Sequence, residues 1–506
     1  MIDKTENTTG LKEKFLKKGF WLYFFSLLSA PIGYIIKIII SGQLSVEDIG
    51  IIYGIISLLT LLSSLNDFGF TESFKYFIPK YLEEKRLDKA KTVLFLGASA
   101  QIITSIIIFL IIFFSSNFIG LNYFSSPIAG EVLKIFSLFF ILINIFQIST
   151  TFFSAIQNTF LEKGVMFLRS IFNLTFVIYL LFIDNVTLNS VSYVFVIGLF
   201  LTTIISSIIF WTKYYKKHFK NQKLFCNKKF ISSIFKYSIV ALFSAQVGTL
   251  LSQVDTQMVI YILGTKDAGY YSNYLSLVTL PFLLIGPLLG FLLPVFSGLN
   301  ANNNREDIYK VKNSLFKYFG IISISAGFFL LGLSQNFAYI FFGEKFLPSG
   351  NILLYSSMFL VFNFLLQINF AVLGGIGKVR DRAEILSYAL LLNIITNIIF
   401  IKIFGVGGAA LATGLGWIFI FFFSEKKLKK DNLHLKSCPT YFLKTFLAGI
   451  ILALILSQIN LLDLSRLKAL GALFIIFIVY LFIMIIINKS DAKNFITEIK
   501  KIRQKK

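Results

Sequence analysis

The sequence predicts an all-α protein that crosses a membrane with about fourteen helices. Of its 506 residues, 56% are hydrophobic and 14% are charged, whereas a soluble domain of average composition has about 25% charged residues. The apolar residues come in long runs, and a helix that spans a bilayer needs about 20 of them. These runs are apolar on every side, so they lack the alternation of membrane β-strands. The composition therefore excludes an ordinary soluble enzyme.

Fourteen apolar runs have the length of a transmembrane helix, and we expect each of them to form one. The runs fall at residues 20–42, 49–66, 92–114, 132–153, 165–183, 191–211, 237–263, 270–296, 315–342, 352–376, 383–404, 406–424, 440–460 and 467–487. The first run is longer than the hydrophobic region of a cleavable signal, so we expect it to be the first span itself. Prolines interrupt two of the spans, at Pro31 and at Pro281, Pro287 and Pro294. Proline removes a backbone donor and bends a helix, which suits elements that flex during transport.

Lysine and arginine fall mainly on one side of the predicted membrane. The spans alternate in direction, so the two tails and the loops that follow even-numbered spans lie on one side of the membrane. These segments contain 41 of the 48 basic residues. Cytoplasmic loops carry such an excess, so we expect both termini in the cytoplasm and the protein in a plasma (bacterial inner) membrane. The net charge of +23 then reflects topology and attraction to anionic membrane lipids, and we expect no nucleic-acid partner.

The chain contains an internal duplication. At an offset of 219, Leu44–Leu62 and Leu263–Pro281 share seven identities in nineteen positions, among them Gly50 with Gly269. The duplication predicts two lobes of six helices each. Because six is an even number, both lobes would have the same orientation in the membrane. A pseudo-two-fold axis along the membrane normal would then relate them, which is a transporter architecture.

The duplication predicts the domain organisation. We expect an N-lobe at residues 1–225 with helices 1–6 and a C-lobe at 226–430 with helices 7–12. Residues 431–506 would add helices 13 and 14 and a basic cytoplasmic tail. The chain is not expected to be an enzyme, because its loops are too short for a folded domain and it has no GxxxxGK[ST] motif.

Two ionisable side chains inside the predicted spans are candidate functional residues, because such groups are costly at membrane depth. Lys37, late in the first span, and Asp255, late in the seventh, occupy nearly equivalent places in the two halves. Lys37 is either a functional cation or a side chain that snorkels to the outer interface. Asp255 is too short to snorkel far, which favours a functional or paired role.

Polar residues of the eleventh and twelfth spans suggest a cation site. Asn393 and Asn397 lie one turn apart on one helix face, and Ala409 precedes Thr413 by one turn. Such amides also simply join neighbouring helices. Together with Asp255, however, two amide oxygens, a hydroxyl and a backbone carbonyl would make an oxygen shell that suits a monovalent cation.

Three segments resemble the polysaccharide-biosynthesis oligosaccharide flippases of the multidrug/oligosaccharidyl-lipid/polysaccharide exporter superfamily. The segments read SGQLSVEDIGIIYGIISL at the first two spans, NDFGFTESFKYFIPKY at 66–81, and GGIGKVRDRAEILSYALLLNIITNIIFIKIFGVGGAALATGL at 374–415. The resemblance covers essentially the whole chain. It implies two six-helix lobes around a central cavity that moves a polyprenyl-diphosphate-linked oligosaccharide to the outer leaflet.

The resemblance also implies a coupling ion. The related lipid II flippases have a sodium site whose motif falls here on Asp255, Asn393, Asn397, Ala409 and Thr413. Asn397 stands where those flippases have a second carboxylate, so sodium and a proton are both candidates. Their cavity arginines have no counterpart in spans 1, 2 and 8 of this chain, which argues against lipid II as the substrate.

The resulting hypothesis is a cation-coupled flippase without a further cofactor. Lys37, Arg169 and Arg382 would bind the substrate diphosphate, although the two arginines are equally consistent with anchors at the cytoplasmic ends of their helices. The expected partners are the lipid-linked oligosaccharide, membrane lipids, a glycan polymerase and glycosyltransferases. Two alternatives stay open, a cation-coupled multidrug exporter of the same superfamily and a non-transporting scaffold.

Overall fold

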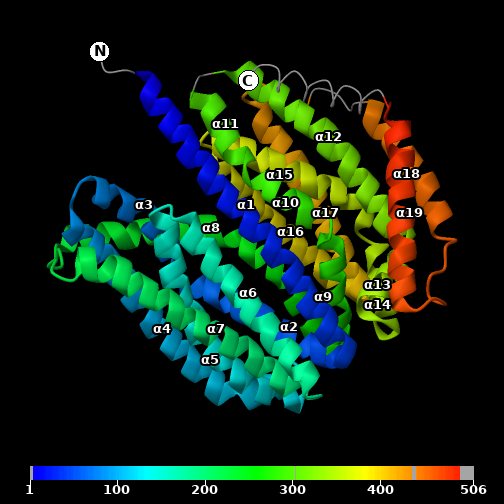
Figure 1. Ribbon diagram of the computed structural model, residues 1–506, viewed down its shortest axis with the longest axis horizontal. Helices are drawn as coiled ribbons and strands as arrows, with labels where there is room; N and C mark the ends of the chain where they lie inside the picture. Colours follow the sequence, from blue (N-terminus) through cyan, green and yellow to red (C-terminus); the bar gives the residue numbers. More distant parts are fainter. Residues whose placement is uncertain (1–3, 302–303, 436–439, 490–506) are drawn as a thin grey trace. The chain divides into compact units, whose positions relative to one another are not determined.

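The described part of the chain, residues 4–301, 304–435 and 440–489, consists of α-helices with a few short π- and 3-10 helical turns and contains no strand (Figure 1). This computed structural model confirms the all-α prediction. Residues 490–506, which include the predicted basic tail, lie outside the described residues.

The helices belong to two compact units. Unit 1 comprises Met1–Ser272 and Phe282–Phe291, and unit 2 comprises Asn273–Pro281 and Leu292–Lys506. The predicted lobe boundaries at 225 and 430 stay a prediction.

Unit 1 contains the first ten α-helices and the π-helix η1, with α9 shared between the two units. The bounds are α1 (Lys4–Gln43), α2 (Val46–Asn66), α3 (Phe70–Glu83), α4 (Leu87–Asn122), α5 (Pro127–Ala155), α6 (Thr159–Phe182), α7 (Leu188–Phe210), the π-helical η1 (Trp211–Phe219), α8 (Lys228–Leu263), α9 (Thr265–Thr279) and α10 (Phe282–Gly290).

Unit 2 contains the remaining helices. The bounds are α11 (Leu292–Ala301), α12 (Arg305–Gly332), α13 (Ser334–Phe342), η2 (Glu344–Phe346), α14 (Leu347–Leu353), η3 (Ser357–Phe359), α15 (Leu360–Gly375), α16 (Val379–Phe404), α17 (Val406–Lys429), α18 (Thr440–Leu456) and α19 (Arg466–Ile487).

Eleven helices among the described residues are long and apolar enough to cross a membrane. They account for eleven of the fourteen predicted spans. The other three are also helical but differ from a simple span. The seventh is the 36-residue α8, the thirteenth is α18 with 17 residues, and the eighth is divided among three short helices.

The eighth predicted span is broken at Pro281 and again at Phe291, three residues before Pro294. α9 ends at Thr279, Pro281 follows in a turn, and α10 gives way to α11 at Phe291. Proline has no backbone N–H and cannot complete the helical ladder, so the run that we expected to form one bent helix is instead broken twice. α1, by contrast, continues through Pro31.

The segment between the second and third predicted spans is a helix, α3, and not only a basic loop. Its aromatic side chains recur with helical spacing, and Phe70, Phe74 and Phe77 are buried in the core of unit 1. An amphipathic helix buries such a stripe against its neighbours. α3 thereby closes one side of a cavity described below.

Candidate functional site

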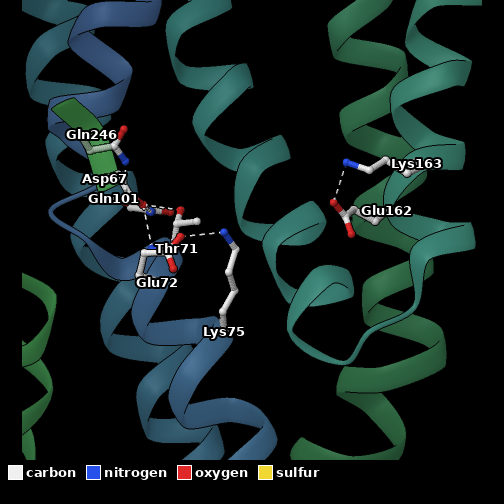
Figure 2. Close-up of polar contacts among 8 residues, drawn as sticks. All are labelled: Asp67, Thr71, Glu72, Lys75, Gln101, Glu162, Lys163 and Gln246. Atoms are coloured by element: carbon white, nitrogen blue, oxygen red, sulfur yellow. Dashed lines mark hydrogen bonds and ion pairs between the residues drawn. The ribbon is translucent and has the colours of Figure 1, made fainter. Parts of the chain in front are cut away.

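Unit 1 contains a cavity of about 370 Å³ between α2, α3, α5, α6 and α8, which we call the unit-1 cavity. Figure 2 shows polar contacts around it. Hydroxyl, amide and charged side chains line much of its wall, namely Thr60, Ser63, Ser64, Thr71, Lys75, Gln147, Thr150, Thr151, Ser154, Glu162, Lys163, Arg169, Gln246 and Thr249. With these groups in its wall, the cavity can hold water or a polar ligand.

Basic groups outnumber acidic groups on the cavity wall. Lys75, Lys163 and Arg169 line it with one carboxylate, Glu162. The Lys163 ammonium lies 2.9 Å from Glu162, and the Lys75 ammonium lies 2.7 Å from Glu72 on α3 (Figure 2). Two of the three cations therefore have a carboxylate partner.

Arg169 is the third cation of the cavity wall. Its guanidinium lies over the Phe139 ring, 5.4 Å from the ring centroid. Within the described part of the chain it makes no hydrogen bond and no ion pair. Five N–H donors of a permanently charged group are thus available to a ligand.

The sequence of α6 places Arg169 on this wall. Asn158 caps the helix by accepting a hydrogen bond from the Leu161 backbone N–H. Glu162, Met166 and Arg169 then follow at i, i+4 and i+7 and share one helix face. Their common face is the one that lines the cavity.

Lys37 is buried inside unit 1, with 7% of its surface exposed. Its ammonium donates to the Ser272 carbonyl oxygen at 2.6 Å and to the Ser272 hydroxyl at 2.8 Å. It also lies 4.1 Å from the centroid of the Tyr53 ring. The ammonium is therefore held against α9 and α2, and its predicted role in substrate binding stays a prediction.

Asp255 is also buried, and it contacts Tyr271, the residue of α9 that precedes Ser272. Its side chain is 5% exposed, and Oδ2 accepts a hydrogen bond of 3.1 Å from the Tyr271 hydroxyl. Two consecutive residues of α9 thus contact the two ionisable groups that occupy nearly equivalent places in the repeat. Tyr271 contacts Asp255, and Ser272 contacts Lys37.

The remaining predicted cation ligands lie in unit 2. Asn393 and Asn397 are buried, and the Asn397 amide donates to the Asn393 amide oxygen at 3.0 Å. Ala409 is buried on α17, where Thr413 is half-buried one turn later. Because Asp255 belongs to unit 1, the five-residue cation site stays a prediction.

Arg382 in unit 2 resembles Arg169 in its surroundings. Its guanidinium lies 5.0 Å from the centroid of Phe370 and has no hydrogen bond or ion pair within the described residues. Each unit therefore contains an arginine that is laid over a phenylalanine from the preceding long helix. The role of both arginines in substrate binding stays a prediction.

The sequence reasoning missed a buried carboxylate beside the unit-1 cavity. Asp67 is fully buried at the turn between α2 and α3 and accepts hydrogen bonds from Thr71, Gln101 and Gln246 (Figure 2). Burial is the main cause that raises the pKa of its carboxyl. Asp67 directly follows the second apolar run, and this position is the signal that could have drawn attention to it.

A structural comparison identifies the fold. The chain superposes on the lipid II flippase MurJ in an inward closed conformation with a TM-score of 0.72 and 18% sequence identity. The match covers 94% of this chain and 99% of that one. The protein therefore has the fold of that flippase.

Sequence comparisons identify relatives in archaea. An uncharacterized membrane protein of Methanocaldococcus jannaschii is 27% identical over 479 residues, which are 88% of this chain and 92% of that protein. The probable low-salt glycan biosynthesis flippase Agl15 of Haloferax volcanii is 25% identical over 191 residues, or 37% of this chain and 39% of that protein. The sequence profile of the family described as polysaccharide biosynthesis protein matches residues 15–300, more than half of the chain. The chain therefore belongs to this polysaccharide biosynthesis family.

Proposed function

We propose that this protein flips a polyprenyl-diphosphate-linked oligosaccharide from the cytoplasmic to the outer leaflet by alternating access. Its membership of the polysaccharide biosynthesis family supports a glycan as cargo. Its similarity to a probable glycan biosynthesis flippase supports flipping as the activity. The family description also favours this function over the multidrug exporter that the sequence left open.

Arg169 in the unit-1 cavity is the observation that carries the proposal. A diphosphate needs charge-assisted donors, and a guanidinium offers two parallel N–H bonds to one phosphate. Arg169 has no carboxylate partner among the described residues, so binding a phosphate would not require an existing ion pair to break. Lys75 and Lys163 add positive charge to the same wall.

The rest of the cavity wall suits the sugar part of the cargo. Thr60, Ser63, Gln147 and Thr150 present hydroxyl and amide groups, which can hydrogen-bond to sugar hydroxyls. The cavity volume of about 370 Å³ fits part of an oligosaccharide. We therefore place the diphosphate and the first sugar there, while the polyprenyl chain stays in the lipid.

We further propose that a cation gradient drives the cycle. Asp255, Asn393, Asn397, Ala409 and Thr413 would bind the cation, as the sequence motif suggests, and sodium or a proton would serve. Support comes from the burial of Asp255 and of both asparagines. Thermal unfolding in sodium chloride and in choline chloride tests the sodium version. Sodium should raise the midpoint of the wild type but not of Asp255→Asn.

The proposed setting is the plasma membrane, with both termini in the cytoplasm. The basic excess in the tails and even-numbered loops supports this orientation. Glycosyltransferases would then supply the lipid-linked oligosaccharide on the cytoplasmic side, and a glycan polymerase would consume it on the other.

The experiment that tests the function compares two cargoes in proteoliposomes. One is a fluorescent polyprenyl-diphosphate oligosaccharide, whose arrival in the outer leaflet is read with a membrane-impermeant quencher. The other is a cationic dye. We expect accelerated flipping of the lipid and no transport of the dye. Dye transport without lipid flipping would identify a multidrug exporter, and neither activity would favour the scaffold.

A further inference from the structure

The carboxylate of Asp67 is buried at a constrained turn of unit 1. The side chain has 0% exposed surface and lies between α2 and α3. The next two residues, Phe68 and Gly69, have positive φ angles of 46° and 76°. A Cβ at Gly69 would lie 1.9 Å from the Ser238 carbonyl oxygen of α8. The turn therefore packs directly on α8, and Asp67 is fixed where α2, α3 and α8 meet.

Every described polar contact of the Asp67 carboxylate is with a hydrogen-bond donor. Oδ1 accepts from the Thr71 backbone N–H at 3.0 Å, the Thr71 hydroxyl at 2.6 Å and the Gln101 amide at 2.7 Å. Oδ2 accepts only a 3.4 Å bond from the Gln246 amide. Oδ2 therefore has spare acceptor capacity and can take a proton.

The charged groups that act on Asp67 come from a single helix. Glu72 and Lys75 lie on α3, and their side chains are paired with each other. α4 and α8 contribute the uncharged amides of Gln101 and Gln246. No cation lies within ion-pair distance of the carboxylate in the described part of the chain. Burial without a cation disfavours the ionised form and raises the pKa of this carboxyl.

The glutamine partners can serve both protonation states of Asp67. An amide donates through its nitrogen to a carboxylate and accepts through its oxygen from a protonated carboxyl after a rotation about the last side-chain bond. The amide oxygen of Gln101 is buried and has no hydrogen-bond partner in the described structure. An acceptor is therefore already present within the shell around Asp67.

Two of the donors to Asp67 also form the wall of the unit-1 cavity. Thr71 and Gln246 line that cavity, as does Lys75. An anion bound near Arg169 and Lys75 would add negative charge on the far side of these residues and favour a neutral Asp67. Because linkage is reciprocal, a protonated Asp67 would in turn favour the anion.

We propose that Asp67 is a proton-binding site coupled to the unit-1 cavity, so that an anionic headgroup and a proton bind there together. The inference rests on the proposed function for the identity of the anion, a diphosphate. It adds a proton carrier in unit 1, separate from the predicted cation ligands Asp255, Asn393, Asn397, Ala409 and Thr413. Protonation replaces a carboxylate that holds α3, α4 and α8 with a weaker acceptor, which loosens the wall of the cavity.

The test measures proton uptake by the full-length protein in lipid nanodiscs. Farnesyl diphosphate serves as a soluble polyprenyl-diphosphate probe, and a pH-sensitive dye reports protons in weakly buffered solution. We expect probe binding to take up protons in the wild type. Asp67→Asn should bind the probe without this uptake, and Asp184→Asn, which alters an exposed carboxylate of unit 1, should behave as the wild type. Equal uptake in Asp67→Asn would overturn the proposal.

A second measurement works without the probe and separates this proposal from the proposed function. Difference infrared spectroscopy across a pH titration should show the carbonyl band of a protonated carboxyl that Asp67→Asn lacks. Thr71→Val keeps the carboxyl but removes a donor that lowers its pKa, so the band should persist to higher pH. Absence of the band in the wild type would overturn the proton site. A band without any probe binding would instead overturn the diphosphate function.

Discussion

Gly50 on α2 and Gly269 on α9 pack against each other in a reciprocal contact. A Cβ at Gly50 would lie 1.8 Å from the Thr265 carbonyl oxygen, and a Cβ at Gly269 would lie 2.0 Å from the Val46 carbonyl oxygen. Gly50 and Gly269 are separated by 219 residues, and so are Val46 and Thr265. Equivalent residues thus exchange the same contact, as two copies related by a two-fold axis do.

This contact predicts the effect of adding one methyl group. Gly50→Ala and Gly269→Ala should each destabilise the protein by about 1–3 kcal/mol, because the new Cβ meets rigid backbone. Thermal unfolding in detergent measures the loss. Gly33→Ala is the matched control, since a Cβ there has nothing within 4 Å. Equal midpoints for all three variants would contradict the close packing of α2 on α9.

The buried Lys37 ammonium contacts a second repeat-related pair. Its partners Tyr53 and Ser272 are also 219 residues apart. Tyr53→Leu should destabilise unit 1 by about 0.5–2 kcal/mol, the range of a cation–π interaction. Tyr53→Phe, which keeps the aromatic face, should leave the unfolding midpoint close to that of the wild type. A loss for Tyr53→Phe as large as that for Tyr53→Leu would show that the hydroxyl, and not the ring, matters.

Unit 2 contains a buried ion pair whose loss should be severe. Lys312 is fully buried, and its ammonium lies 2.6 Å from Glu425 and donates to the Leu433 carbonyl oxygen at 2.8 Å. Lys312→Met leaves Glu425 without its cation, and breaking such a pair costs about 3–5 kcal/mol. Adding Glu425→Gln should restore much of the stability.

An exposed ion pair on the same helix is the control for this variant. Lys310 pairs with Glu306 at 2.6 Å in solvent, and surface pairs of this kind contribute little. Lys310→Met should therefore leave the unfolding midpoint unchanged. A loss as large as that of Lys312→Met would mean that charge near the start of α12, and not burial, stabilises this helix.

The buried Asp67 predicts a pH dependence of stability. Its folded pKa is raised above the ordinary value of 3.8, chiefly by burial, so the folded state binds this proton more tightly than the unfolded chain. The free energy of unfolding from this group therefore falls as pH rises from 3.8 to the raised pKa and stays constant above it. Asp67→Asn should lack this fall. Chemical unfolding at several pH values measures the difference, and parallel curves would contradict it.

The sequence was sufficient to predict most of the fold because membrane helices need long apolar runs. It also predicted a distortion of the helix near Pro281, since proline removes a hydrogen bond wherever it lies, but it did not predict that the span divides into separate helices. It did not identify α3 as a helix, because Phe70, Phe74 and Phe77 form an amphipathic stripe that is shorter than a span. A search for long apolar runs does not detect such a stripe.

The candidate site was predicted less completely than the fold. Lys37, Asp255 and Arg169 were visible because ionisable groups inside apolar runs stand out. Asp67 lies one residue beyond such a run, and its importance depends on burial by α4 and α8. Contacts between residues far apart in the chain cannot be inferred from one sequence, so Gln101 and Gln246 could not be assigned to it.

The most direct measurement compares lipid flipping by the wild type with flipping by Arg169→Gln in proteoliposomes. The cargo is the fluorescent polyprenyl-diphosphate oligosaccharide. Lys402→Gln removes a positive charge from an exposed position of unit 2 and serves as the control. Loss of one charge-assisted contact of about 1.5–3 kcal/mol should slow flipping by Arg169→Gln at subsaturating cargo about 10- to 100-fold, with Lys402→Gln unchanged. Equal rates for Arg169→Gln and the wild type, at equal protein incorporation, would contradict the assignment of the unit-1 cavity to the diphosphate.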